Sequence, residues 1–219
     1  MTILVTGATG QVGRHVVAQL AAAGERVRAM TRAAMPAAMP AAMPAAVPAG
    51  VEVVRGDLLK PESVAAALSG VDRLYLFPEP RTATEVVDAA VRAGVRRVVT
   101  LSSGAVSAGL DDDFQLPVER AVEASGLEWT HLRPGEFASN TLKLFGPPIR
   151  ASRAVRYCNP DWRGLPIHEA EAYSPTSVPE LTVEEWDAML RPLPTVEEVT
   201  GRPARTYARW VRDNVEEFR

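Results

Sequence analysis

Short β-branched runs alternate with helical patterns along the first 135 residues of this chain, and this rhythm limits its fold more than any other feature. The runs fit buried parallel strands, which are apolar throughout because both faces of such a sheet are covered. Expected strands cover residues 2–6, 26–31, 51–58, 72–77, 96–103 and 127–135. Parallel neighbours need crossover connections, so helices must pass over the sheet. The sequence therefore predicts an α/β fold with a doubly wound parallel sheet, the Rossmann fold, and ligands at the carboxyl ends of its strands.

The first expected strand leads directly into a glycine motif, "VTGATGQVG", at residues 5–13. Gly7, Gly10 and Gly13 lie between an apolar strand and an amphipathic helix, which is the context in which such a triplet binds a dinucleotide. The turn needs positive φ angles and room for a pyrophosphate against the backbone. The start of the helix offers N–H groups and a positive dipole end to the phosphates. The alternative is a tight glycine turn without a ligand, and the context favours the dinucleotide site.

Side chains at the ends of the other strands indicate which dinucleotide binds. Arg32 ends the second strand, where an acid favours NAD(H) and an arginine pairs with the 2′-phosphate of NADP(H). No acid occupies residues 29–34, so we expect NADP(H) rather than NAD(H), unless Arg32 is only a surface side chain. Asp57 follows the third strand and reaches the adenine, caps the next helix, or does both. Ser102 and Ser103 end the fifth strand near the expected nicotinamide, although serines at strand ends are common.

Charge and composition exclude several classes of partner. The net charge of −3 argues against nucleic acid, because phosphate binding needs a basic face. No apolar run approaches the length of a membrane span, and the N-terminus lacks the pattern of a secretion signal. Cys158 is the one cysteine, so no internal disulfide forms and a reducing compartment is expected. We expect a cytoplasmic protein that binds a small-molecule substrate.

The motifs together resemble those of the NmrA-like, or atypical, short-chain dehydrogenases, above all their bacterial NADPH-dependent quinone reductases and NAD(P)H-binding relatives. The resemblance rests on "TGATGQVG" (6–13), "GDL" (56–58), "LSS" (101–103) and "EWTHLRPGEFASNTL" (128–142). The segment "TVEEVTGRPARTYARWV" (195–211) is similar to the C-terminal segment of these bacterial proteins. The resemblance therefore covers most of residues 1–142 and one stretch near the C-terminus.

The resemblance implies a set of cofactor contacts in this chain. Those expected at the pyrophosphate are Gly7, Thr9, Gly10, Gln11, Val12 and Gly13. Arg32 is expected at the 2′-phosphate, and Asp57 and Leu58 are expected to flank the adenine. Phe77 and Pro78 are expected beside the ribose and pyrophosphate, and the wall near the nicotinamide is expected from Pro134, Gly135 and Phe137.

The catalytic pair of typical short-chain dehydrogenases is missing from this sequence. That pair is Tyr-x-x-x-Lys, in which the lysine lowers the pKa of the tyrosine so that it exchanges a proton with substrate. Tyrosines occur only at 75, 157, 173 and 207 and lysines only at 60 and 143, so no pair has this spacing. Quinone-reducing relatives also lack the pair, and a quinone accepts hydride with little acid help. No catalytic residue is assigned.

The resulting hypothesis is an NADPH-dependent oxidoreductase that transfers hydride to a small conjugated acceptor, first of all a quinone. Two alternatives stay open. One is a non-catalytic NADP(H)-sensing protein that changes its affinity for a partner. The other is an enzyme of specialised metabolism that uses the same fold for different chemistry.

The alternation fails after Pro134, where residues 134–194 hold many prolines and few periodic runs. We therefore expect a cofactor-binding domain at 1–133 and a short, partly irregular substrate region at 134–219. Thr195 and Glu198 suit a capping box, as do Thr82 and Glu85 before the helix at 82–94. One apolar helical stripe near the C-terminus consists of Tyr207, Trp210, Val211, Val215 and Phe218. An exposed stripe of this kind is compatible with a homodimer.

The repeat "AAMPAAMPAAMPAAVP" at 33–48 is expected to form a loop insertion in the first domain, because its prolines prevent a continuous helix. It either folds over the adenosine as a flap or is neutral. His131 is expected to be a satisfied strand histidine rather than a proton donor. His168 has acidic neighbours without metal-ligand spacing, so no metal site is expected.

Overall fold

The computed structural model describes residues 1–32, 47–154, 166–167, 201–202 and 207–218. Contacts divide the chain into two compact units, residues 1–132 and 133–219. Most of the 33–48 repeat lies outside the described residues, and so do Cys158, Trp162, His168 and both members of the capping box at 195 and 198.

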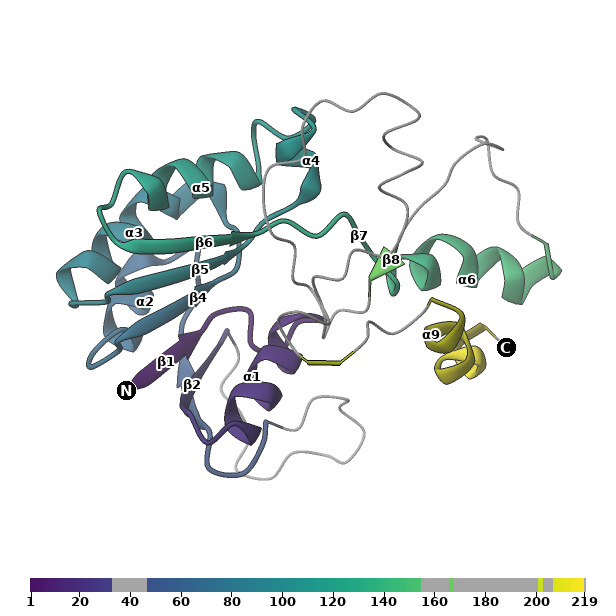
Figure 1. Cartoon of the computed structure of the whole chain (residues 1–219), viewed down its shortest axis with the longest axis horizontal. Coiled ribbons are helices and arrows are strands. Elements are labelled where there is room, and N and C mark those ends of the chain that lie inside the picture. Colours follow the sequence, from purple (N-terminus) through teal and green to yellow (C-terminus); the bar gives the residue numbers. More distant parts are fainter. Residues whose placement is uncertain (33–46, 155–165, 168–200, 203–206, 219) are drawn as a thin grey trace. The chain divides into compact units, whose positions relative to one another are not determined.

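The first unit is built on one six-stranded sheet in which every strand pair is parallel. Its strands are β1 (Thr2–Val5), β2 (Arg26–Thr31), β3 (Glu52–Arg55), β4 (Arg73–Leu76), β5 (Arg97–Leu101) and β6 (Glu128–Leu132). The strand order is β3-β2-β1-β4-β5-β6 (Figure 1). This order reverses direction at β1, which confirms the predicted doubly wound sheet of the Rossmann fold.

Helices cover the two faces of this sheet unequally. One apolar core joins Leu4, Leu74 and Val98 of the strands to α2 (Pro61–Ala67), α3 (Ala83–Arg92) and α5 (Gln115–Glu123). The opposite face carries α1 (Gly13–Ala22), which packs on β1 and β2 (Figure 1). Right-handed crossovers produce this division, because the chain runs toward one edge of the sheet after β1 and toward the other edge after β3.

The start of α3 shows a different use of Thr82 from the one predicted. Thr82 precedes α3, but its side chain makes no cap hydrogen bond. Its hydroxyl donates instead to the carbonyl of Leu58 at 2.6 Å. The predicted capping box with Glu85 is therefore wrong, because a contact with a loop distant in the sequence takes the hydroxyl.

The second unit contains more helix than the sequence predicted. Its described elements are β7 (Glu136–Phe137), β8 (Pro166–Ile167), α6 (Asn140–Ser152), α9 (Tyr207–Asp213) and the 3₁₀ helix η3 (Val215–Phe218). Prolines such as Pro147 and Pro148 led to the prediction of an irregular region, but the 13-residue helix α6 continues through both of them. An interior proline weakens a helix, but packing outweighs this cost: α6 contacts η3 and β7.

The apolar stripe predicted near the C-terminus does not lie on one continuous α-helix, because α9 ends at Asp213 and a 3₁₀ helix follows. Trp210 of α9 is buried, whereas Val215 follows in η3 and is exposed. None of the helices within the described ranges is long and apolar enough to cross a membrane.

Candidate cofactor site and an adjacent polar cluster

The loop between β1 and α1 turns sharply at its first glycine. Gly7 has a φ of +60°, a left-handed conformation that glycine adopts without steric cost. The Gly10 N–H donates to the Gly7 carbonyl at 2.9 Å, and the Arg14 N–H donates to the Gly10 carbonyl at 3.1 Å. Residues 6–12 thus form a short hydrogen-bonded loop that leads from β1 into the first turn of α1.

An added side chain would be crowded at all three glycines, and at Gly10 its Cβ would lie 3.1 Å from the carbonyl oxygen of Gly7. A Cβ on Gly13 would lie 2.2 Å from the carbonyl oxygen of Gly7. A Cβ on Gly7 would lie 3.1 Å from the Cβ of Phe77. At the tip of the loop, Thr9, Gly10 and Gln11 are exposed. An accessible backbone at a helix N-terminus fits a pyrophosphate, because N–H groups there have no partner within the helix.

Phe77 is held beside this loop by a hydrogen-bonded link between β1 and β4. The backbone N–H and the hydroxyl of Thr6 each donate to the carbonyl of Tyr75 at 3.0 Å. The same hydroxyl accepts from the Phe77 N–H at 2.7 Å. Phe77 as a residue is 42% exposed, and Pro78 is buried. The structure therefore brings Phe77 against the glycine loop and leaves part of its ring available to a ligand.

The ends of β2 and β3 bring the expected adenosine residues to the same edge of the sheet. Arg32 is exposed directly after β2, and Gly56 after β3 donates to the Thr31 carbonyl at 2.9 Å. The Asp57 carboxylate accepts from the Leu59 N–H at 3.1 Å. Because α2 begins after Lys60 without a side-chain cap, the helix-cap role considered for Asp57 is wrong.

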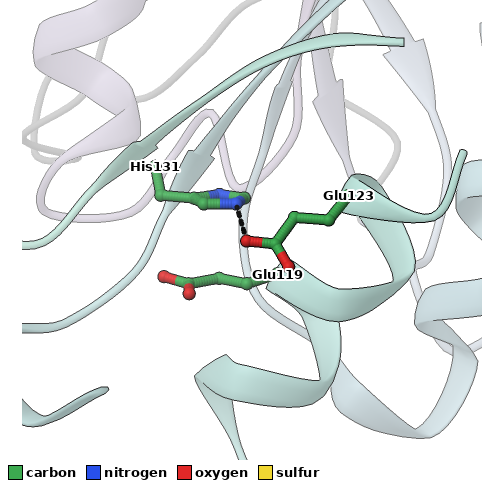
Figure 2. Close-up of side chains that lie close together, drawn as sticks. All are labelled: Glu119, Glu123 and His131. Carbon is green, nitrogen blue, oxygen red and sulfur yellow. Dashed lines mark ion pairs between the residues drawn. The ribbon is translucent and has the colours of Figure 1, made fainter. Parts of the chain in front are cut away.

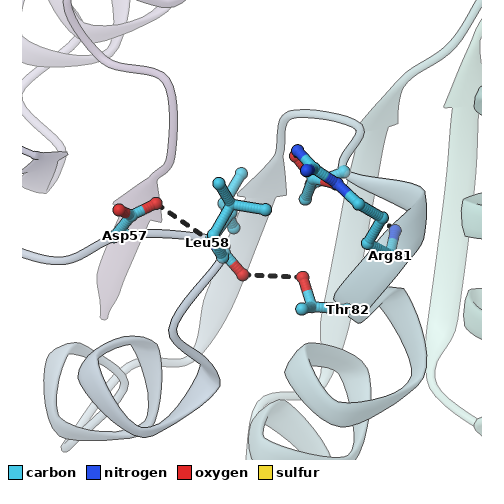
Figure 3. A network of polar contacts seen from close by, with 6 residues as sticks. Asp57, Leu58, Arg81 and Thr82 are labelled. Carbon is cyan, nitrogen blue, oxygen red and sulfur yellow. Dashed lines mark hydrogen bonds and ion pairs between the residues drawn. The ribbon is translucent and has the colours of Figure 1, made fainter.

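Leu58 lies between Asp57 and Thr82 in a polar network that joins this loop to the segment after β4 (Figure 3). Leu58 receives the Thr82 hydroxyl on its carbonyl, and its partly buried side chain packs on the apolar core. Nearby, Arg81 forms an ion pair with Glu79 at 2.8 Å and lowers the pKa of that carboxyl. These contacts hold the expected adenine-side loop in place.

The two serines after β5 have different partners. The Ser103 hydroxyl accepts from the Ala105 N–H at 3.1 Å and caps the short helix α4 (Gly104–Ser107). Ser102 is buried, and its hydroxyl donates to the carboxylate of Glu119 on α5. In the described residues, then, Ser103 serves a helix and Ser102 faces α5.

A polar cluster lies between α5 and the end of the sheet formed by β5 and β6. It contains Glu119, Glu123 and His131, whose ligand atoms all lie within 4.8 Å of one another (Figure 2). The His131 Nε2 lies 3.4 Å from Glu123 Oε1, and its Nδ1 lies 2.6 Å from the hydroxyl of Thr100. The sequence analysis missed both glutamates, and their i, i+4 spacing on one helix was the available signal.

The remaining predicted residues belong to the second unit. Pro134 and Gly135 precede β7, and Phe137 lies within it. Gly135 has nothing within 4 Å of an added Cβ. Burial raises the pKa of Glu136, between Gly135 and Phe137.

Tyr75 is poorly suited to act as a conventional tyrosine acid. Tyr75 is buried in β4, and burial raises the pKa of its hydroxyl. A phenol with a raised pKa is a poorer proton donor. Lys60 and Lys143 are exposed on α2's leading loop and on α6.

Comparison with known proteins identifies the family of this chain. The family model described as NAD(P)H-binding matches residues 7–144. The chain belongs to this NAD(P)H-binding family. This result confirms the resemblance to the NmrA-like, atypical short-chain dehydrogenases, and the matched range contains the glycine loop, Arg32, Asp57 and the polar cluster.

One curated member similar over its whole length is the (4-alkanoyl-5-oxo-2,5-dihydrofuran-3-yl)methyl phosphate reductase of Streptomyces griseus. It is 32% identical, with 99% of each chain covered. That alignment spans 290 residues, more than the 219 of this chain, so the relative contains segments with no counterpart here.

Two solved structures of NAD(P)H-binding reductases are also similar. The Citrobacter sp. triphenylmethane reductase complexed with NADP(H) is 28% identical with a TM-score of 0.56, covering 70% of this chain and 55% of that one. The Escherichia coli NADPH-dependent quinone oxidoreductase complexed with NADPH is 25% identical with a TM-score of 0.64, covering 78% and 61%. This chain therefore spans little more than half the length of either structure.

Proposed function

We propose that this chain is an NADPH-dependent reductase that transfers hydride to a small conjugated acceptor, first of all a quinone. The observation that carries the proposal is the glycine loop, whose tight packing at Gly7 and Gly13 leaves an exposed backbone at the start of α1. Bound NADPH supplies the hydride. Gly10 and Gln11 would meet its pyrophosphate, and Arg32 its 2′-phosphate.

The choice of NADPH rests on charge at the end of β2. Arg32 is exposed there, and no acid follows β2 within the expected ribose position. A guanidinium pairs with a phosphate through two parallel hydrogen bonds, whereas a ribose hydroxyl pair favours a carboxylate. Both structural relatives named above were crystallised with NADP(H) or NADPH, which supports the same choice.

The acceptor class follows from what the protein lacks and from what its relatives reduce. Without the Tyr-x-x-x-Lys pair, the protein contributes position more than proton transfer, which suits an acceptor that takes hydride readily. The E. coli relative is a quinone oxidoreductase. The S. griseus relative is named for a ring with a carbonyl at position 5 and an alkanoyl group at position 4. Because the alignment with that relative, gaps included, covers 99% of its length, a conjugated furanone is our second candidate acceptor.

The proposal is tested by following NADPH oxidation at saturating cofactor with quinones and alkanoyl-furanone phosphates in parallel. We expect turnover above background with at least one quinone and a preference for NADPH over NADH. Turnover with furanones alone would transfer the proposal to the second candidate. Tight NADPH binding without reduction of any acceptor would overturn the reductase proposal and favour a cofactor-sensing protein.

A further inference from the structure

The cluster of Glu119, Glu123 and His131 has the dimensions of a transition-metal site. A tetrahedral zinc ion holds its nitrogen and oxygen ligands at about 2.0–2.2 Å, which separates any two of them by about 3.4 Å. His131 Nε2 and Glu123 Oε1 lie 3.4 Å apart. The third ligand atom, from Glu119, lies within 4.8 Å of both. Small side-chain rotations would bring all three to one ion.

The imidazole is already oriented for coordination. His131 and Thr100 are paired residues of β6 and β5, and the Thr100 hydroxyl lies 2.6 Å from Nδ1. A hydrogen bond at one ring nitrogen directs the other nitrogen toward a metal, as the outer partners of zinc-bound histidines do. The His131 side chain is 4% exposed, so the strand and the neighbouring helix restrict its rotation.

The carboxylates supply the remaining ligands and the charge. Glu119 and Glu123 are four residues apart on α5 and project from the same side of that helix toward His131 (Figure 2). Ser102 donates to one oxygen of Glu119, and a carboxylate has lone pairs enough to accept this bond and coordinate as well. Two carboxylates this close repel each other, and a divalent cation would neutralise them.

The cluster is accessible to solvent on one side. Glu119 is buried, whereas the Glu123 side chain is 44% exposed, so an ion can enter along Glu123. The geometry points to a three-ligand site for Zn²⁺ or a similar borderline transition ion, formed by Glu119, Glu123 and His131 with water as the fourth ligand. The bound ion would hold α5 against β6 beside the carboxyl ends of the strands.

The test uses the full-length protein without a histidine tag, stripped with a chelator and dialysed. Zn²⁺ is titrated by calorimetry, Co²⁺ is followed by its visible absorption, and Tm is measured with and without Zn²⁺. We expect one equivalent to bind, tetrahedral-type Co²⁺ bands, and a rise in Tm on the order of 5–10 °C at 100-fold excess over Kd.

Variants assign the ligands. The Glu123 side chain is nearly half exposed, so the Glu123→Gln variant should fold normally. This variant should weaken Zn²⁺ binding at least about 100-fold and abolish the rise in Tm. His131→Gln should do the same. His15→Gln, on α1 at the opposite face of the sheet, is the matched control and should leave binding unchanged. Absence of binding to the parent protein, or binding that survives Glu123→Gln and His131→Gln, would overturn the site and leave a simple ion pair. NADPH affinity is measured alongside, because the metal site stands whether or not the reductase proposal does.

Discussion

The two polar regions at the carboxyl edge of the sheet, the glycine loop and the cluster of Glu119, Glu123 and His131, are formed by different parts of the chain. The glycine loop after β1 is made of backbone, and its packing leaves no space for a Cβ at Gly13. The cluster after β5 is made of side chains from α5 and β6, which contact the side chains of Ser102 and Thr100. The glycine loop requires that its glycines carry no Cβ, whereas the cluster requires particular side-chain groups.

This difference predicts how each region responds to substitution. An added methyl group at Gly13 meets the backbone of Gly7, so the main chain of the loop must move. A changed side chain in the cluster leaves the strands and α5 in place, because the apolar core beneath them is separate. A single added methyl group in the loop should therefore cause a large loss of NADPH affinity. In the cluster, the loss of stability should depend on which group replaces the original side chain.

The largest effect is expected for Gly13→Ala. Its Cβ would lie 2.2 Å from the Gly7 carbonyl oxygen, so the loop must move away from α1. Such overpacking against backbone costs about 3 kcal/mol, which corresponds to roughly 100-fold weaker NADPH binding. Fluorescence titration measures the Kd, and Ala18→Ser on the exposed side of α1 is the control. An unchanged Kd would show that the cofactor does not use this loop.

The next largest effect is expected for substitution of Glu119 in the cluster. Glu119→Ala removes the partner of the buried Ser102 hydroxyl and should lower the free energy of unfolding by about 2–3 kcal/mol. Glu119→Gln keeps an acceptor for that hydroxyl and should cost clearly less. Denaturant unfolding measures both. NADPH affinity should change little in the Gln variant, and a large loss there would contradict the independence of the two regions.

Arg32 tests whether the loop side alone sets cofactor preference. Arg32→Ala should weaken NADPH binding about 10- to 30-fold and leave NADH binding nearly unchanged, because only NADPH carries the 2′-phosphate. Arg26→Ala, at the opposite end of β2, is the matched control. Equal losses for the two cofactors would show that Arg32 does not read the phosphate.

The smallest effect is expected at Ser103, next to the cluster but outside it. Ser103→Ala removes the cap of α4 and should cost about 1 kcal/mol of unfolding free energy. Neither NADPH affinity nor Zn²⁺ binding should respond. A change in Zn²⁺ affinity as large as that of Glu123→Gln would show that the cluster extends beyond Ser102.

Sequence reasoning succeeded where the signal is local. The apolar runs of β1, β4 and β5 are largely buried, as predicted, whereas the edge strands β3 and β6 are mostly exposed because each has a neighbour on one side only. The glycine triplet has the spacing of one turn followed by one helix. It failed where distant segments compete for one group. The Thr82 hydroxyl bonds to Leu58, 24 residues away, instead of capping α3. The helix α6 continues through Pro147 and Pro148 because its contacts with η3 and β7 outweigh local propensity.

The sequence by itself determined the doubly wound sheet and the glycine loop, because hydrophobic period and glycine spacing act over a few residues. It also determined that no Tyr-x-x-x-Lys pair exists. Only the tertiary structure decided that Phe77 lies against Gly7 and that Ser102 faces Glu119. It alone brought His131 to Glu119 and Glu123, since the pairing of β6 with β5 and the packing of α5 join residues that no sequence motif connects.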